Sequence, residues 1–149
     1  MAVTSTNAVQ REIHVNATPD TVFSFLVEPA KLRRWMTIGG TDTIREGADF
    51  RYEMTKEDIA SGRYLEIKRP SRVVMTWGWE GDDALTPPGS STVEITLTPE
   101  RGGTLVRLTH RGLPSEESAT KHGHGWQHYL ERLSVAAAGG DPGPDSFQD

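Results

Sequence analysis

Apolar and polar residues alternate along several stretches of the chain, which is the pattern of strands that bury one face. In the first such stretch, residues 10–17, the apolar side carries Ile13, Val15 and Ala17. Other stretches combine alternation with β-branched and aromatic side chains, which favour strands. The strands predicted in this way cover residues 10–17, 50–55, 64–69, 73–79, 92–98 and 105–110.

Capping residues mark two short helices after the first strand. Thr18 is a suitable N-cap, Pro19 suits the first helical position, and Asp20 places a negative charge at the positive end of the helix dipole. Pro29 interrupts the helical pattern, because proline cannot continue a helix. We therefore expect a second short helix that begins at Pro29 and ends near residues 35–36.

The pattern predicts one long helix near the C-terminus. Ser115 is its N-cap, and Glu116 and Glu117 lie in its first turn. Small and apolar residues then recur at steps of three and four, as on the buried face of an amphipathic helix. These positions are Ala119, Gly123, Trp126, Leu130, Leu133 and Ala137. The helix spans about 20 residues and ends before Gly139.

The order of these elements predicts an α+β fold. Short connections such as Arg101-Gly102-Gly103 join neighbouring strands as hairpins, which implies a curved antiparallel sheet of six to seven strands, while Gly39-Gly40 marks a break. The long helix is the element large enough to cover the apolar face of the sheet. Residues 10–138 form one domain. Residues 1–9 are small and polar, and residues 139–149 are rich in Gly, Pro and Asp, so both ends are expected to be flexible.

Composition excludes several classes of function. The formal net charge of −5 disfavours nucleic acid as a partner, and the absence of cysteine removes thiol chemistry and disulfides. No apolar run approaches the ~20 residues of a membrane span, and residues 1–9 lack the features of a signal peptide, so we expect a cytoplasmic protein. No nucleotide-binding or hydrolase motif is present, and no cofactor is expected.

Several segments together resemble the bacterial proteins named for homology to the activator of Hsp90 ATPase, which belong to the START-like, Bet v 1-like helix-grip superfamily. They are REIHVNATPDTVFSFLVEPAKLRRWM, GADFRYEM, GRYLEIKRPSRVVMTWGW, STVEITLTPERGGTLVRLTHRGLP and GWQHYLERL. Together they extend from about Arg11 to Leu133. The resemblance implies a helix-grip fold with a cavity between the sheet and the long helix that holds a hydrophobic or amphipathic small molecule.

Strand parity and helix spacing then indicate which side chains face such a cavity. His110 shares its side of the strand with Val106 and Leu108, and Trp77 shares its side with Val73. Aromatic side chains that converge with a few polar atoms are typical of a small-molecule site. The predicted ligand-binding residues are Trp35, Phe50, Tyr52, Met54, Trp77, His110, Trp126 and Leu130.

Two histidine features remain open from the sequence alone. His110 is either a binding or acid–base residue, or a buried neutral histidine bonded to a neighbouring carbonyl or hydroxyl. His124 and His128 are four residues apart, like a zinc-binding pair, and His122 lies nearby. No third ligand is evident on their face of the helix, and His124 and His128 are expected to face solvent. We therefore predict no metal site.

Two further features of the sequence are a glycine on the long helix and an acidic run after residue 79. Gly123 either lets the long helix approach the sheet closely or leaves room for a ligand. The acidic run of Glu80, Asp82 and Asp83 is expected in a solvated loop.

Three functions are compatible with this sequence. The first is a non-enzymatic binding protein for a hydrophobic small molecule, with no catalytic residue. The second is an enzyme of the cyclase, aromatase or hydrolase type, in which His110 and Tyr52 would handle protons. The third is a chaperone-regulating module, as the family name suggests, which would need an exposed apolar patch. Homodimerisation through an edge strand or the long helix stays open.

Overall fold

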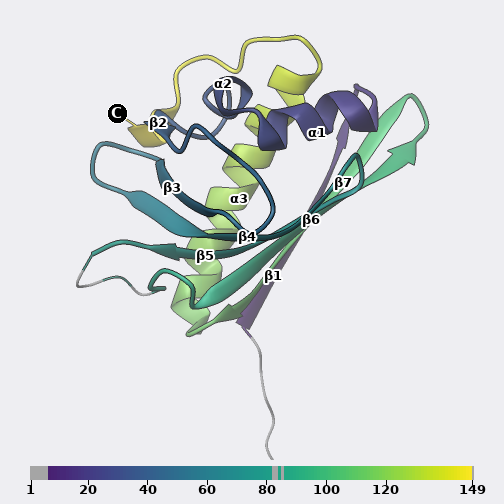
Figure 1. Ribbon diagram of the computed structural model, residues 1–149. Coiled ribbons are helices and arrows are strands. Elements are labelled where there is room, and N and C mark those ends of the chain that lie inside the picture. Colours follow the sequence, from purple (N-terminus) through teal and green to yellow (C-terminus); the bar gives the residue numbers. More distant parts are fainter. Residues whose placement is uncertain (1–6, 82–83, 85, 149) are drawn as a thin grey trace, which may run out of the picture.

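The computed structural model describes residues 7–81, 84 and 86–148 of the chain. In this part of the chain, seven antiparallel strands form one sheet in the order β1-β7-β6-β5-β4-β3-β2, which bends around the long helix α3 (Figure 1). The strands are β1 (Asn7–Val15), β2 (Gly39–Gly40), β3 (Asp49–Glu53), β4 (Ile59–Lys68), β5 (Arg72–Trp79), β6 (Ser91–Glu100) and β7 (Gly103–Leu113). The helices are α1 (Pro19–Val27), α2 (Pro29–Leu32), α3 (Glu116–Ala137) and the 3₁₀ turn η1 (Ser146–Gln148).

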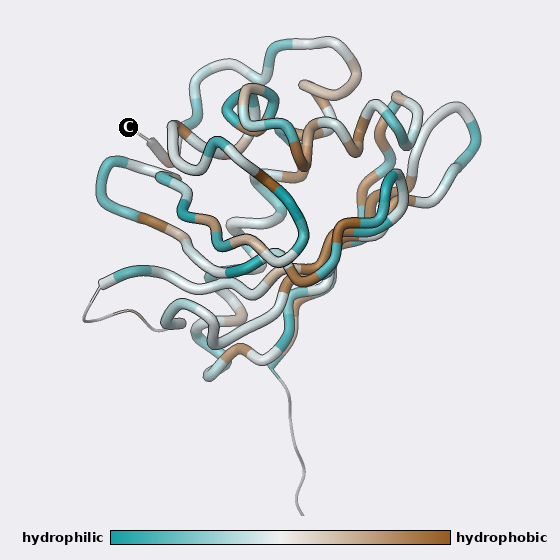
Figure 2. The backbone as a smooth tube through the Cα atoms, in the orientation of Figure 1, coloured by the Kyte–Doolittle hydropathy of each residue, from teal (hydrophilic) through white to brown (hydrophobic). Residues whose placement is uncertain are grey.

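This architecture confirms the predicted α+β helix-grip fold. Hydrophobic segments concentrate where the sheet faces α1 and α3 (Figure 2), so the core lies between these layers. The predicted hairpin turn joins β6 to β7, where Glu100 pairs with Gly103 across Arg101 and Gly102. Gly102 has a φ of 75°, a conformation that glycine adopts without steric cost. Among the helices of the described residues, none is long and apolar enough to cross a membrane.

Both predicted N-caps form. The Thr18 hydroxyl accepts a hydrogen bond from the Thr21 amide at 3.2 Å, and the Ser115 hydroxyl accepts one from the Ser118 amide at 3.0 Å. The helix α2 is shorter than predicted and ends at Leu32, after which the chain continues in turns to Met36. The buried Trp35 explains this difference, because its indole nitrogen donates to the Phe25 carbonyl at 3.0 Å and turns the chain into the core.

Gly123 lets α3 approach the edge strand β1. A Cβ atom at this position would lie 2.7 Å from Nη2 of Arg11 and 3.7 Å from Cγ1 of Val9. The glycine therefore faces the strand, which resolves the alternative left open by the sequence in favour of close helix–sheet packing. Gly125, in contrast, has open space beside it.

The described parts of both chain ends contact the rest of the domain. Strand β1 begins at Asn7, and Asn7 and Val9 pair with Leu113 and His110 of β7. The segment after α3 folds back onto the helix, where Arg132 donates to the carbonyls of Pro142 and Pro144, each at 3.4 Å. Asp145 is buried there with 6% of its surface exposed. Composition predicts a flexible tail and carries no information about such contacts with a distant helix.

The break predicted at Gly39-Gly40 is a short edge strand. These two residues pair with Glu53 and Tyr52 of β3. Gly40 has a φ of 126°, and a Cβ atom there would lie 2.2 Å from the Arg51 carbonyl oxygen. The glycine is therefore needed for the close approach of β2 to β3.

Candidate functional site

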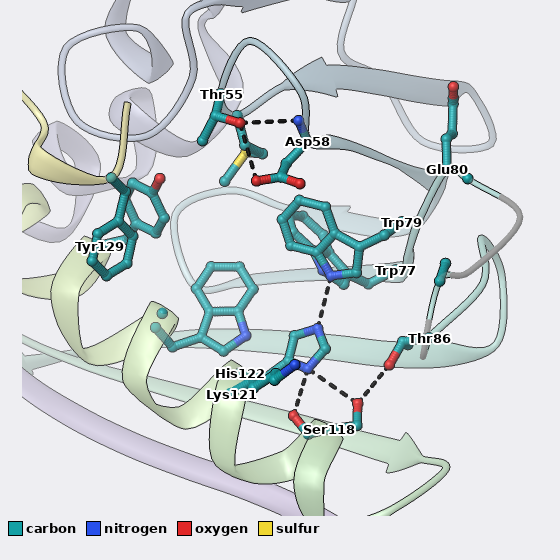
Figure 3. Close-up of a pocket in the computed structure, with 16 residues that line it drawn as sticks. Thr55, Asp58, Trp77, Trp79, Glu80, Thr86, Ser118, Lys121, His122 and Tyr129 are labelled. Carbon is teal, nitrogen blue, oxygen red and sulfur yellow. Dashed lines mark hydrogen bonds between the residues drawn. The ribbon is translucent and has the colours of Figure 1, made fainter. Parts of the chain in front are cut away.

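A pocket of about 760 Å³ opens between the end of β5, the turn between β3 and β4, and the first half of α3 (Figure 3). Trp77 and Trp79 of β5 form one wall, and His122 and Trp126 of α3 form the facing wall. Phe147 of η1 also contributes to the lining, so the folded-back C-terminal segment borders the pocket.

The walls of the pocket are mainly aromatic. The ring of Trp77 lies 5.1 Å from that of Trp126 and 5.8 Å from that of Trp79, which it meets edge to face. On its other side Trp77 packs against Phe50 at 5.8 Å. Trp77 therefore connects the core to the pocket, and its position is held from three directions.

His110 is completely buried beside this wall, and both of its ring nitrogens are bonded. Nδ1 lies 3.0 Å from Nε1 of Trp126, and Nε2 lies 2.7 Å from Oγ of Ser91. An indole nitrogen can only donate, so Nδ1 of His110 is the acceptor and the ring proton is on Nε2. Ser91 in turn donates its hydroxyl hydrogen to the Trp77 carbonyl at 2.7 Å. Of the two alternatives that the sequence left open, His110 is therefore the buried histidine bonded to its neighbours.

Burial and, to a smaller extent, the neighbouring His122 lower the pKa of His110 to about 3. A positive charge on this ring would have no carboxylate partner among the described residues, and its Nδ1 hydrogen would meet the indole hydrogen of Trp126. His110 is therefore a neutral structural group at ordinary pH.

In His122 the roles of the two ring nitrogens are the reverse of those in His110. Its Nε2 accepts a hydrogen bond from Nε1 of Trp79 at 2.9 Å, so its Nδ1 carries the proton and donates to the Ser118 carbonyl at 2.8 Å. Burial lowers the pKa of this ring as well, partly offset by the bond to Ser118. The two imidazole rings meet edge to face with centroids 4.6 Å apart. Neither histidine retains a free ring nitrogen for proton transfer to a bound molecule.

A hydroxyl pair connects α3 to the loop after β5. The Thr86 and Ser118 hydroxyl oxygens lie 2.5 Å apart, and both residues are buried. The Thr86 carbonyl also accepts the Trp79 amide hydrogen at 2.7 Å. These bonds hold the Trp79 wall of the pocket against the helix, as the dashed lines of Figure 3 show in part.

The structure divides the predicted ligand-binding residues into two groups. Met54, Trp77 and Trp126 line the pocket. The others are packed in the core outside the lining, namely Trp35, Phe50, Tyr52, His110 and Leu130. They lie on the predicted faces, but neighbouring side chains fill the space in front of them.

Tyr52 does not pair with His110. Its hydroxyl lies 2.7 Å from that of Tyr64, and burial raises the pKa of Tyr52 to about 12. Burial also raises the pKa of Tyr64 well above its usual range. The proton-handling pair of the enzyme hypothesis is therefore separated into two closed hydrogen-bonded groups.

Sequence reasoning did not select several residues of the pocket as ligand-binding. Trp79 shares its parity with Trp77 and is on that basis a candidate pocket wall, although it is not among the predicted ligand-binding residues. His122 lies four residues before Trp126, so its position also carried a usable signal. Phe147 carried none, because it lies in a Gly- and Pro-rich tail. Tyr129 also lines the pocket, and burial followed by the nearby Asp145 raises its pKa.

The prediction that His128 faces solvent is wrong. Its Nε2 lies 2.7 Å from Oδ1 of Asp145, and its ring stacks on Phe147 with centroids 3.8 Å apart. His124 is exposed, as expected. Within residues 7–81, 84 and 86–148, no group of three His, Cys, Asp or Glu side chains is arranged to hold a metal ion.

The acidic run after β5 is seen only in part. Glu80 is exposed and forms an ion pair with Arg51 at 3.0 Å. Asp82 and Asp83 lie outside the described residues.

A bent antiparallel sheet closed by one long helix, with an aromatic pocket between them, defines a helix-grip protein. The family model described as "Activator of Hsp90 ATPase homolog 1-like protein" matches residues 16–138, and the chain belongs to this family. No protein of curated function matches the chain by sequence.

Solved structures agree with this assignment. An AHSA1-like protein from Rhizobium etli is 42% identical, with a TM-score of 0.77 over 100% of this chain and 92% of that chain. CalU16 from Micromonospora echinospora is 28% identical, with a TM-score of 0.70 over 89% of this chain and 76% of that chain. The Aha1 dimer from Colwellia psychrerythraea is 18% identical, with a TM-score of 0.76 over 89% of this chain and 97% of that chain. It shares the fold.

Proposed function

We propose that this protein binds a hydrophobic or amphipathic small molecule in the pocket between β5 and α3. The observation that carries the proposal is the aromatic lining of a pocket of about 760 Å³, formed by Trp77, Trp79 and Trp126. Pockets of about 300–1,000 Å³ with mostly apolar walls and a few placed polar groups are typical of small-molecule sites.

The energetics support occupancy of this pocket. Removing apolar surface from water contributes about 25 cal/mol per Å², so a ligand that covers 100 Å² of such wall gains about 2.5 kcal/mol from burial alone. The wall needs little reorganisation, because the rings of Trp79 and Trp126 are already held by His122 and His110. A preformed site avoids part of the entropic cost of binding.

The catalytic alternative receives less support. His110 and His122 each use one ring nitrogen to hold a tryptophan of the wall and the other to bond Ser91 or Ser118. His128, which stacks on Phe147, has its Nε2 bonded to Asp145. A general base needs a nitrogen or oxygen that can reach the substrate proton. The chaperone-regulating alternative rests on the family name alone, and recovery of a bacterial Hsp90 in a pull-down would support it.

Binding of the neutral fluorescent probe N-phenyl-1-naphthylamine tests the proposal. We expect a saturable rise in fluorescence, because the probe leaves water for an aromatic pocket. Phe147→Ala, which removes a ring from the lining, should weaken binding, whereas Leu65→Ser, at an exposed position of β4 outside the lining, should not. No saturable signal, together with no adduct by native mass spectrometry across lipid and aromatic compounds, would refute the proposal.

A further inference from the structure

The indole nitrogen of Trp77 is a buried donor without an acceptor. Trp77 is 1% exposed, lines the pocket, and its Nε1 has no hydrogen-bond partner in the part of the chain that the structure describes. Trp35, Trp79 and Trp126, in contrast, donate their indole hydrogens to Phe25, His122 and His110. A buried N–H group that lacks an acceptor is costly, so such a group calls for an explanation.

The side chains packed around Trp77 do not supply the missing acceptor. Phe50, Trp79 and Trp126 present aromatic rings, and the His110 ring lies 6.5 Å away. Both His110 nitrogens are already used, one by an indole hydrogen and one by Ser91. Trp77 lines the pocket, so the pocket is the open space next to its ring.

We propose that the molecule bound in this pocket carries a hydrogen-bond acceptor, such as a carbonyl or ether oxygen, which takes the Trp77 indole hydrogen. This inference rests on the proposed function and specifies the ligand class: an apolar body with an embedded acceptor, rather than a pure hydrocarbon. A buried donor that meets no acceptor discriminates against ligands that lack one, because its desolvation is then uncompensated.

The charged groups around the pocket lie at its rim rather than beside Trp77. Asp58 and Lys121 are exposed, and the Asp58 carboxylate accepts a hydrogen bond from Thr55 (Figure 3). Glu80, also at the rim, is paired with Arg51. Recognition at the inner wall therefore depends on a neutral donor, which suits a neutral acceptor.

Three tricyclic compounds of nearly equal shape test the inference: 9-fluorenone with a carbonyl acceptor, fluorene with a methylene group, and carbazole with an N–H donor. Each is titrated against bound N-phenyl-1-naphthylamine. We expect fluorenone to displace the probe at about five- to tenfold lower concentration than fluorene, the effect of one net hydrogen bond. Carbazole should be no better than fluorene.

Matched variants locate the effect. Trp77→Phe removes the indole hydrogen and should abolish the preference for fluorenone. Trp79→Phe removes another pocket indole whose hydrogen already bonds His122, and should retain the preference. Independently of whether Trp77→Phe folds, the indole ¹H–¹⁵N signals of the wild type report the bond, and fluorenone but not fluorene should shift one of them downfield.

The outcomes separate the two proposals. If the probe itself does not bind, the proposed function fails. If the probe binds but fluorenone and fluorene displace it equally, and no indole signal moves downfield, the acceptor inference is overturned while binding stands. A fluorenone preference that survives Trp77→Phe would also overturn it.

Discussion

Nδ1 of His110 and Nε1 of Trp126 lie 3.0 Å apart, deep between β7 and α3. A second pair repeats this arrangement nearer the opening, where His122 accepts from Trp79 at 2.9 Å. In each pair one residue comes from the sheet and the other from the helix. The two bonds therefore fix α3 against the sheet and orient two walls of the pocket.

These pairs predict opposite tautomers. His110 should carry its proton on Nε2 and His122 on Nδ1, because each accepts an indole hydrogen on the other nitrogen. His110 should remain neutral at pH 5.5, since its pKa is lowered to about 3, and burial also lowers the pKa of His122. Long-range ¹H–¹⁵N spectra distinguish the two tautomers and the cation. Two identical tautomers, or a cationic His110 at pH 5.5, would contradict the arrangement.

Ser91→Ala should destabilise the fold by about 1–3 kcal/mol. The substitution leaves the Nε2 hydrogen of His110 and the carbonyl of Trp77 without their partner, and both groups are buried. Urea unfolding measures the change. Ser90→Ala is the matched control, because Ser90 makes an exposed bond to Pro87 and its loss should stay within about 0.5 kcal/mol. Equal effects of the two substitutions would contradict the prediction.

Stability should fall as the pH falls below about 6.5. The unfolded chain protonates His110 near its ordinary pKa of 6.5, whereas the folded protein resists protonation until a pKa of about 3. Between these values the unfolded state binds more protons, so His110 alone contributes a slope of up to about 1.4 kcal/mol per pH unit.

Urea unfolding at pH 7.5, 6.5 and 5.5 checks this slope. The surface residue His14 changes stability with pH in the opposite direction, because its hydrogen bond to Glu100 raises its pKa. Its contribution is present at low pH, and His14→Ala should therefore make the decline steeper. Constant stability of the His14→Ala variant from pH 7.5 to 5.5 would rule out the proposed linkage.

Substitutions at two glycines of α3 should distinguish effects on stability from effects on ligand binding. Gly125 lines the pocket with open space beside it, so Gly125→Ala should stabilise the helix by about 0.5–1 kcal/mol. Gly125→Leu should narrow the pocket and weaken binding of N-phenyl-1-naphthylamine without unfolding the protein. Gly123→Ala, which faces Arg11 on β1, is the control and should leave binding unchanged. Normal probe binding by Gly125→Leu would place the binding site elsewhere.

Asp145 should hold the C-terminal segment over α3. Its Oδ1 accepts hydrogen bonds from Nε2 of His128 at 2.7 Å and from the Phe147 amide at 2.9 Å. Asp145→Ala should therefore favour local opening by about 1–2 kcal/mol, seen as about 5- to 30-fold faster hydrogen exchange at the Phe147 amide. Asp141→Ala, which removes an exposed bond to Gly143, should leave this rate unchanged. An unchanged rate in Asp145→Ala would show that other contacts hold the segment.

Local sequence signals determined most of the fold. The hydroxyls of Thr18 and Ser115 cap the helices that they predict, and Arg101-Gly102 forms the predicted hairpin turn. These signals are readable because each depends on residues within a few positions of one another. The family resemblance then supplied the arrangement of strands and helices, which periodicity alone leaves open.

The composition of the pocket was decided by the tertiary structure. Strand parity correctly placed Tyr52, Trp77 and His110 on the inner face, yet only Trp77 reaches the lining. Parity states which side of a sheet a residue occupies, but not whether other side chains fill the space in front of it. The pairing of His122 with Trp79 and of His128 with Asp145 joins residues 43 and 17 positions apart. Such contacts depend on where the helix and the tail come to lie, and no local pattern encodes that placement.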